Sequence, residues 1–246
     1  MIETRKLTME FAGFRAVDGV DLSVQRGHIH ALIGPNGAGK TTCFNMITKF
    51  LTPTRGQVIL EGRDVTRTPP AAIARDGIVR SFQISAVFQE LTVLQNVCVA
   101  LQSKNHRVYS ILRSDASLQD LMMRASELLE LVGLSDYRHE KARLLSYGRK
   151  RALELATTLA MDPKVMLLDE PMAGMSPEDV RRVTDLIARL RAGRTILMVE
   201  HNLSVVAEIS DRITVLARGK VLAEGSYDEV SANKYVQSAY IGAGYE

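Results

Sequence analysis

Hydrophobic residues in the first third of the chain form short runs or alternate with polar residues, a pattern that predicts strands. These strands are predicted at residues 7–11, 20–24, 29–33, 58–60 and 78–82. Glycines and an aspartate between the first two strands favour tight turns, so this pair is expected to be antiparallel. Helical spacing begins at Lys40 and predicts a helix over residues 40–50, which Pro53 and Gly56 bring to an end.

The middle of the chain has a different pattern, because its apolar residues recur three or four positions apart and no strand pattern interrupts them. Examples are Leu121, Ala125, Leu128, Leu129 and Val132. We therefore expect a helical subdomain of about residues 91–150 within a single domain of residues 1–246. Residues 1–90 and 160–246 are expected to form the core of that domain.

The last third of the chain alternates between strand and helix patterns. Apolar runs at 165–168 and 195–199 flank a helix predicted at 178–190, which has one apolar face. This order predicts a parallel sheet covered by helices. Short runs at 213–216 and 221–223 surround a glycine and predict a closing hairpin. The expected fold class is α/β, with a parallel sheet, an antiparallel β subdomain and a helical subdomain.

The composition excludes several classes of protein. With 46% hydrophobic and 24% charged residues the chain is typical of a globular domain, and a net charge of +3 is too small to indicate nucleic acid as a partner. No apolar run approaches the roughly 20 residues of a membrane-spanning helix, and the first residues do not read as a signal peptide, so we expect a cytoplasmic protein. Cys43 and Cys98 belong to no metal-binding spacing and are expected to be buried thiols.

A glycine-rich loop follows the strand predicted at 29–33 and fits the phosphate-binding pattern GxxxxGK[ST]. Glycine lets successive N–H groups converge on phosphate oxygens, and the N-terminus of the next helix attracts negative charge. Lys40 can reach the β and γ phosphates, and the Thr41 hydroxyl can bind Mg²⁺. The alternative is a chance glycine-rich turn, which the strand before the loop and the helix after it disfavour. The predicted ATP-binding residues of this loop and the first helical turn are Gly34, Pro35, Asn36, Gly37, Ala38, Gly39, Lys40, Thr41 and Thr42.

Two adjacent acids, Asp169 and Glu170, follow the strand predicted at 165–168. Ligands bind at the carboxyl ends of strands in open α/β sheets, so both carboxylates are expected in a site. Asp169 suits the Mg²⁺ shell, and Glu170 is placed to accept a proton from an attacking water. The alternative is an acidic strand end without a function, which the phosphate-binding loop earlier in the chain disfavours.

The segment Leu145-Ser146-Tyr147-Gly148-Arg149 precedes a predicted helix and, further on, the acidic pair. Together the three motifs resemble those of the ATP-binding subunit of ABC transporters, and the resemblance covers nearly the whole chain. It implies a P-loop NTPase core of the ABC ATPase type that binds ATP with Mg²⁺ and hydrolyses it. It also implies that Ser146 and Gly148 contact the γ-phosphate of a nucleotide on a partner subunit. Taken alone, the segment favours a serine helix cap with a glycine turn, but its position before Asp169 and Glu170 favours the family motif.

The resemblance also implies roles for three residues outside these motifs. Gln83 resembles a glutamine that meets Mg²⁺ and the attacking water and links the nucleotide site to the membrane partner. His201 resembles the histidine that hydrogen-bonds the γ-phosphate and orients Glu170. Phe11 resembles the aromatic residue that stacks on adenine, with Phe14 as its competitor and a core phenylalanine as the alternative.

The sequence departs from the family pattern at two positions. Arg149 stands where glutamine is commoner, and Ser176 stands where many members carry aspartate. Neither change affects the expected phosphate, metal or base residues, so hydrolysis is still expected. The basic cluster of Arg149, Lys150 and Arg151 is expected to be a solvated helix face or to lie near phosphate, rather than to bind nucleic acid.

The C-terminal tail, the residues after Glu170 and the segment Arg80-Ser81-Phe82-Gln83 look most like those of importers of branched-chain or hydrophobic amino acids. The resemblance implies two polytopic membrane subunits, a head-to-tail dimer with a second ATPase subunit (itself or a homologue), and an extracytoplasmic solute-binding protein. The chain would then lie at the cytoplasmic face of the inner membrane, attached through its protein partners. The alternatives are a urea importer, an export ATPase of the lipopolysaccharide type and a soluble ABC ATPase without a transport role.

Overall fold

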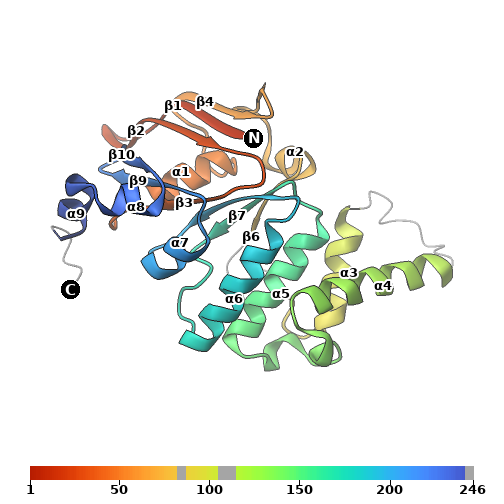
Figure 1. Ribbon diagram of the computed structural model, residues 1–246. Coiled ribbons are helices and arrows are strands. Elements are labelled where there is room, and N and C mark those ends of the chain that lie inside the picture. Colours follow the sequence, from red (N-terminus) through yellow and green to blue (C-terminus); the bar gives the residue numbers. More distant parts are fainter. Residues whose placement is uncertain (82–86, 105–114, 242–246) are drawn as a thin grey trace.

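The computed structural model describes residues 1–81, 87–104 and 115–241, which form two sheets and a set of helices (Figure 1). The larger sheet has six strands in the order β10-β9-β3-β8-β7-β6. Its strands are β3 (Ile29–Ile33), β6 (Ile78–Ser81), β7 (Val165–Asp169), β8 (Thr195–Val199), β9 (Arg212–Ala217) and β10 (Lys220–Gly225). All neighbours in it are parallel except β9 and β10, which form the predicted hairpin. Because helices cover both faces, the central strands are buried along nearly their whole length.

The smaller sheet is antiparallel and has the strand order β2-β1-β4-β5. It consists of β1 (Ile2–Phe11), β2 (Phe14–Val24), β4 (Arg55–Leu60) and β5 (Arg63–Asp64). The first two strands are longer than the alternation at 7–11 and 20–24 predicts, and pair from Ile2 with Val24 to Phe11 with Phe14. Helix α1 (Lys40–Ile47) packs between the two sheets, where Phe44 belongs to a core shared with both.

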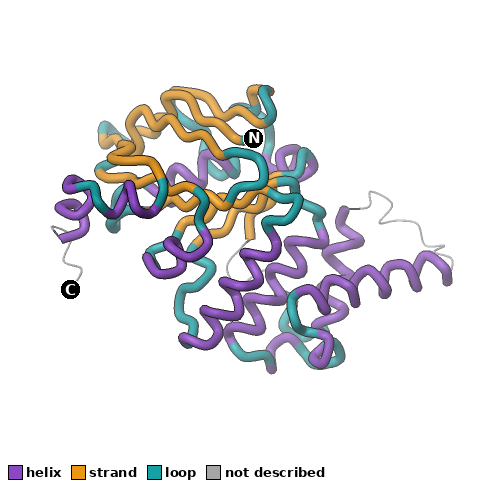
Figure 2. Tube along the Cα trace, viewed as in Figure 1, coloured by secondary structure: helices purple, strands orange, loops and turns teal. Residues whose placement is uncertain are grey.

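The remaining helices lie on the opposite face of the larger sheet or beside it (Figure 2). They are α2 (Pro70–Arg75), α3 (Val93–Lys104), α4 (Asp115–Leu131), α5 (Tyr147–Ala160), α6 (Pro177–Leu190), α7 (Leu203–Ile209), α8 (Tyr227–Ser231) and α9 (Lys234–Ile241). Helix α5 connects α3 and α4 to the helices that cover the larger sheet, because it packs against α3 and α4 on one side and against α6 on the other. Apolar residues of α5 and α6 share one core cluster with β7 and β8. Across the described ranges, no helix combines the length and the hydropathy that a membrane span requires.

Two expectations about the first helix and the cysteines need correction. The helix predicted over 40–50 ends at Ile47, because Thr48 caps it and Lys49 adopts φ 65°, in the left-handed region. Cys43 is fully buried as expected, whereas Cys98 is only half-buried.

Lys49 follows the cap of α1 at a position where glycine is the favoured residue. Its N–H donates to the Met46 carbonyl at 3.3 Å, as a left-handed residue at a helix end does. Its side-chain ammonium is buried and has no hydrogen-bond partner among the described residues. Burial lowers the pKa of Lys49 to about 8, although the nearby Asp64 carboxylate opposes the shift.

Replacing Lys49 with glycine should therefore stabilise the protein. We expect Lys49→Gly to raise the free energy of unfolding at pH 7 by about 1–2 kcal/mol, since it removes left-handed strain and a buried ammonium. Because the pKa of Lys49 is about 8 in the folded chain and 10.5 as its ordinary value, wild type should gain stability as the pH rises through that interval. The difference in the free energy of unfolding between wild type and Lys49→Gly should therefore be smaller at pH 10 than at pH 7.

Urea unfolding at pH 7 and pH 10 measures both effects. Lys49→Ala is the matched control, because it removes the ammonium but keeps the left-handed strain, and it should be less stable than Lys49→Gly at both pH values. Equal stability of Lys49→Gly and Lys49→Ala would contradict the prediction that the left-handed backbone at position 49 is strained.

Candidate functional site

The phosphate-binding loop, residues 34–39, joins β3 to α1 and passes close to two neighbouring segments. Gly34 has φ 146° and Gly39 has φ 98°, values that side-chain-bearing residues rarely adopt. A Cβ on Gly34 would lie 2.1 Å from the Leu216 carbonyl oxygen, and one on Gly39 would lie 2.5 Å from the Ala16 carbonyl oxygen. Glycine is therefore required at both positions for steric as well as conformational reasons.

The N-terminus of α1 is left open toward this loop. Its N-cap, Gly39, has no side chain to accept a hydrogen bond, and the first turn carries no acidic residue. The first N–H groups of a helix have no partner within it, so those of α1 can donate to an anion. Thr41, in this first turn, is exposed and has its hydroxyl available at the same place.

Lys40 lies across the loop from which it emerges. Its ammonium donates hydrogen bonds to the carbonyl oxygens of Gly34 at 2.5 Å and Pro35 at 2.9 Å. Burial lowers the pKa of Lys40, whereas the carboxylates of Glu170 and Asp169 act in the opposite direction. The structure thus brings the predicted lysine and both predicted acids together, although the acids lie far along the chain.

Asp169 ends β7 and is held by an arginine from the next strand. Its carboxylate accepts a hydrogen bond from the guanidinium of Arg80 in β6. The same guanidinium donates to the Asn45 side chain of α1 at 2.6 Å and lies over the Phe44 ring, 5.5 Å from its centroid. Arg80 therefore ties the acidic strand end to the helix that follows the phosphate-binding loop.

Glu170 begins a turn with φ 45°, a strained value for a residue with a side chain. Its N–H donates to the Val199 carbonyl at 2.9 Å, and its own side chain is exposed. Arg151 of α5 donates to the carbonyls of Glu170 at 3.1 Å and Pro171 at 3.3 Å. The backbone of the turn is thus fixed while its carboxylate stays accessible.

The expectation of a solvated or phosphate-facing surface for the basic cluster is wrong for Arg151. This residue is buried and forms an ion pair with Glu154, one helical turn further along α5. Burial raises the pKa of Glu154, and the Arg151 partner opposes that shift. The sequence interpretation failed because the groups that receive Arg151 are backbone carbonyls of a distant segment.

His201 lies in the loop after β8, and its side chain is about half exposed. The residue before it, Glu200, is fully buried and was not singled out from the sequence. Glu200 accepts hydrogen bonds from the N–H groups of His201 at 2.8 Å and Asn202 at 3.0 Å, and from Met172 N–H at 3.0 Å. An acid directly after an apolar strand, as at Glu170, is the signal that could have identified it.

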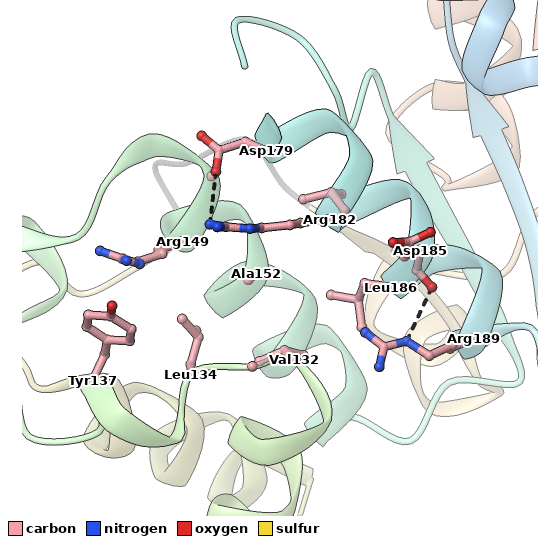
Figure 3. Close-up of a pocket in the computed structure, with 13 residues that line it drawn as sticks. Val132, Leu134, Tyr137, Arg149, Ala152, Asp179, Arg182, Asp185, Leu186 and Arg189 are labelled. Carbon is pink, nitrogen blue, oxygen red and sulfur yellow. Dashed lines mark hydrogen bonds and ion pairs between the residues drawn. The ribbon is translucent and has the colours of Figure 1, made fainter. Parts of the chain in front are cut away.

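Ser146 and Gly148 lie where the helix-cap pattern predicts. Ser146 caps α5, and its hydroxyl accepts from the Arg149 N–H at 3.5 Å. A Cβ on Gly148 would lie 2.5 Å from a carboxylate oxygen of Asp179 in α6, so a side chain at 148 would displace that carboxylate. Arg149 stands over the Tyr137 ring at 4.0 Å from its centroid, beside a cavity of about 430 Å³ (Figure 3).

Three further residues come from the sequence predictions, namely Phe11, its competitor Phe14 and Gln83. Phe11 and Phe14 face each other across the turn of the first hairpin and are 45% and 69% exposed, so the core alternative is wrong for both. Either ring is accessible for stacking. Gln83 lies outside the described residues.

Comparison with known proteins identifies the family. A family model described as ABC transporter matches residues 17–173. The chain belongs to the ABC transporter family. A second model, described as branched-chain amino acid ATP-binding cassette transporter, matches residues 220–246.

Individual members of the family are similar over nearly the whole chain. The high-affinity branched-chain amino acid transport ATP-binding protein BraF of Pseudomonas aeruginosa is 38% identical, with 98% of each chain covered. The crystal structure of the ADP conformation of MJ1267, an ATP-binding cassette of an ABC transporter, is 33% identical, with a TM-score of 0.87 and 98% of each chain covered. The dimeric structure of MJ0796, a bacterial ABC transporter cassette, is 27% identical with a TM-score of 0.78, and covers 92% of this chain and 99% of that one.

These findings confirm the resemblance that the motifs indicated and the predicted α/β fold class. They also confirm that this ABC transporter chain is an ATPase subunit coupled to transport.

The steric requirement at Gly39 gives a direct test of the loop. We expect Gly39→Ala to lower the free energy of unfolding by about 2–4 kcal/mol, because left-handed strain adds to the clash with Ala16, and to weaken ATP binding strongly. Gly37→Ala is the control, since Gly37 has φ 76° but no atom within 4 Å of an added Cβ, and it should cost only about 1 kcal/mol. Urea unfolding and ATP titration calorimetry measure these effects. Equal losses in the free energy of unfolding for Gly39→Ala and Gly37→Ala would refute the steric requirement at Gly39.

Proposed function

We propose that the chain is the ATP-binding and hydrolysing subunit of an importer of branched-chain or other hydrophobic amino acids. The observation that carries the ATPase assignment is the glycine-rich loop that ends at the open N-terminus of α1, with Arg80 tying Asp169 to that helix. The match of residues 220–246 and the similarity to BraF support the cargo class. They favour amino-acid import over the urea and export alternatives.

ATP would bind along the phosphate-binding loop. Backbone N–H groups of the loop and of the first turn of α1 would donate to the phosphates. Lys40 would exchange its hydrogen bonds with Gly34 and Pro35 for bonds to the β and γ phosphates. Phe11 or Phe14 would stack on the adenine, since both rings are exposed at the hairpin turn.

The oxygen donors near the loop fit Mg²⁺. Hard cations of this kind take oxygen ligands, usually one or two carboxylates together with substrate phosphates. Thr41 and Asp169 would supply the hydroxyl and the carboxylate, and we expect Gln83 to join them. Bound Mg²⁺ would neutralise charge on the transferring phosphoryl group.

The hydrolytic step would use residues from two neighbouring strand ends. Glu170 follows β7 with its carboxylate exposed, and would accept a proton from the attacking water. His201 follows β8, the strand paired with β7, and would hydrogen-bond the γ-phosphate. Lys40 would stabilise the charge that develops on the phosphoryl oxygens.

A second ATPase subunit would complete each site. Ser146 and Gly148 begin α5, where helix N–H groups and a hydroxyl can donate to the γ-phosphate held by a head-to-tail partner. The dimeric structure of MJ0796 supports assembly of two ATPase subunits. Two polytopic membrane subunits and a solute-binding protein outside the membrane would form the rest of the transporter. The chain would be attached peripherally to the cytoplasmic face of the membrane.

Lys40→Ala tests the phosphate contact. Loss of a charge-assisted hydrogen bond should weaken ATP binding at least about tenfold, while the folded chain persists. Lys164→Ala is the control, because Lys164 is exposed and pairs with Glu61 away from the loop. Titration calorimetry that found the two variants equal in ATP affinity would contradict the role of Lys40.

Glu170→Gln tests the proposed base. The variant should bind ATP as wild type does, lose about 10²- to 10⁴-fold in hydrolysis, and accumulate as an ATP-bound dimer. Light scattering with ATP and a phosphate-release assay measure these outcomes. Glu127→Gln on the exposed face of α4 is the control. A Glu170→Gln chain that stayed monomeric with ATP, or hydrolysed it normally, would disprove the assignment.

A further inference from the structure

Glu200 is a fully buried carboxylate whose hydrogen bonds go to backbone N–H groups. The basic side chain recorded near it among the described residues is that of its neighbour His201, with Nδ1 3.9 Å from Oε2. Burial of an ionised carboxylate is costly unless several donors surround it. The backbone donors therefore hold Glu200 in one position, and Glu200 in turn holds them.

The two oxygens of Glu200 connect two different segments of the site. Oε1 accepts from Met172 N–H at 3.0 Å, two residues after Glu170. Oε2 accepts from the N–H groups of His201 and Asn202 at 2.8 Å and 3.0 Å. One carboxylate thus joins the turn after β7 to the loop after β8.

The turn that Glu200 holds is under strain. Glu170 has φ 45°, and such a conformation persists only where the surroundings determine it. Arg151 binds the carbonyl side of the turn and Glu200 binds its N–H side. Without Glu200, the Met172 N–H would lose its partner and the turn could relax.

We infer that Glu200 is a positioning residue, which sets the place of the Glu170 carboxylate relative to the His201 side chain. Its side chain is fully buried, and it acts through the backbone of both segments. The inference rests on the roles proposed above for Glu170 and His201.

Glu200→Gln is the test variant, because it keeps the size of the side chain but replaces one acceptor oxygen with an NH₂ group that faces backbone donors. In the purified full-length chain we expect kcat for ATP hydrolysis to fall about 10- to 100-fold, as displaced catalytic groups lose rate, with ATP affinity changed less than about twofold. Glu200→Asp keeps the charge but shortens the side chain, and should have an intermediate kcat. It also serves if Glu200→Gln does not fold.

Two further variants separate positioning from general instability. Leu190→Ala opens a cavity at the far end of α6, so it should lower the melting temperature yet keep kcat near wild type. His201→Ala removes the imidazole but keeps the N–H that Glu200 binds. If Glu200 acts partly through His201, Glu200→Gln should cost at least about threefold less in kcat when His201 is already alanine.

The outcomes distinguish this inference from the proposed function. A wild-type rate in His201→Ala would overturn the role of His201. A rate loss in His201→Ala with a wild-type rate in both Glu200 variants would overturn the inference alone. The inference would also be overturned if the kcat losses of Glu200→Gln and His201→Ala simply multiplied in the double variant. A Leu190→Ala chain whose kcat fell as far as that of Glu200→Gln would overturn it too.

Discussion

The close approach of residues 34–39 to two carbonyl oxygens determines where the site residues lie. Gly34 passes against Leu216 of β9, and Gly39 passes against Ala16 of β2, so the loop is held between the two sheets. The loop then delivers α1 into the core between them, with Lys40 at its start. The phosphate-binding residues are consequently fixed by backbone packing, before any side chain contributes.

Two buried side chains near the acidic pair hold the backbone around it, although Arg151 also forms an ion pair with Glu154. Arg151 donates to carbonyl oxygens of the Glu170 turn, and Glu200 accepts from N–H groups of the same turn and of the next loop. Arg80, by contrast, binds the Asp169 side chain directly. The Glu170 carboxylate stays exposed, whereas the side chain of Met172 in the same turn packs into the core.

Sequence patterns located the strands β3, β7 and β8 and the motif residues, because a buried parallel strand is a continuous apolar run and a phosphate-binding loop needs glycine at set positions. They failed where the deciding partner is distant. The burial of Arg151 depends on carbonyls some twenty residues on, and Glu200 depends on Met172. The early end of α1 depends on Lys49 taking a conformation that its residue type disfavours. Local propensity contains none of this information.

The contact between Gly148 and Asp179 has a consequence for how this protein can diverge. The first turns of α5 and α6 are so close that an added methyl group at 148 would overlap the carboxylate at 179. A larger residue at 148 therefore requires the Asp179 side chain to turn away or to be replaced by a smaller one. Substitutions at the two positions should therefore be correlated among descendants of this chain, although position 179 lies outside the 145–149 motif that contains Gly148.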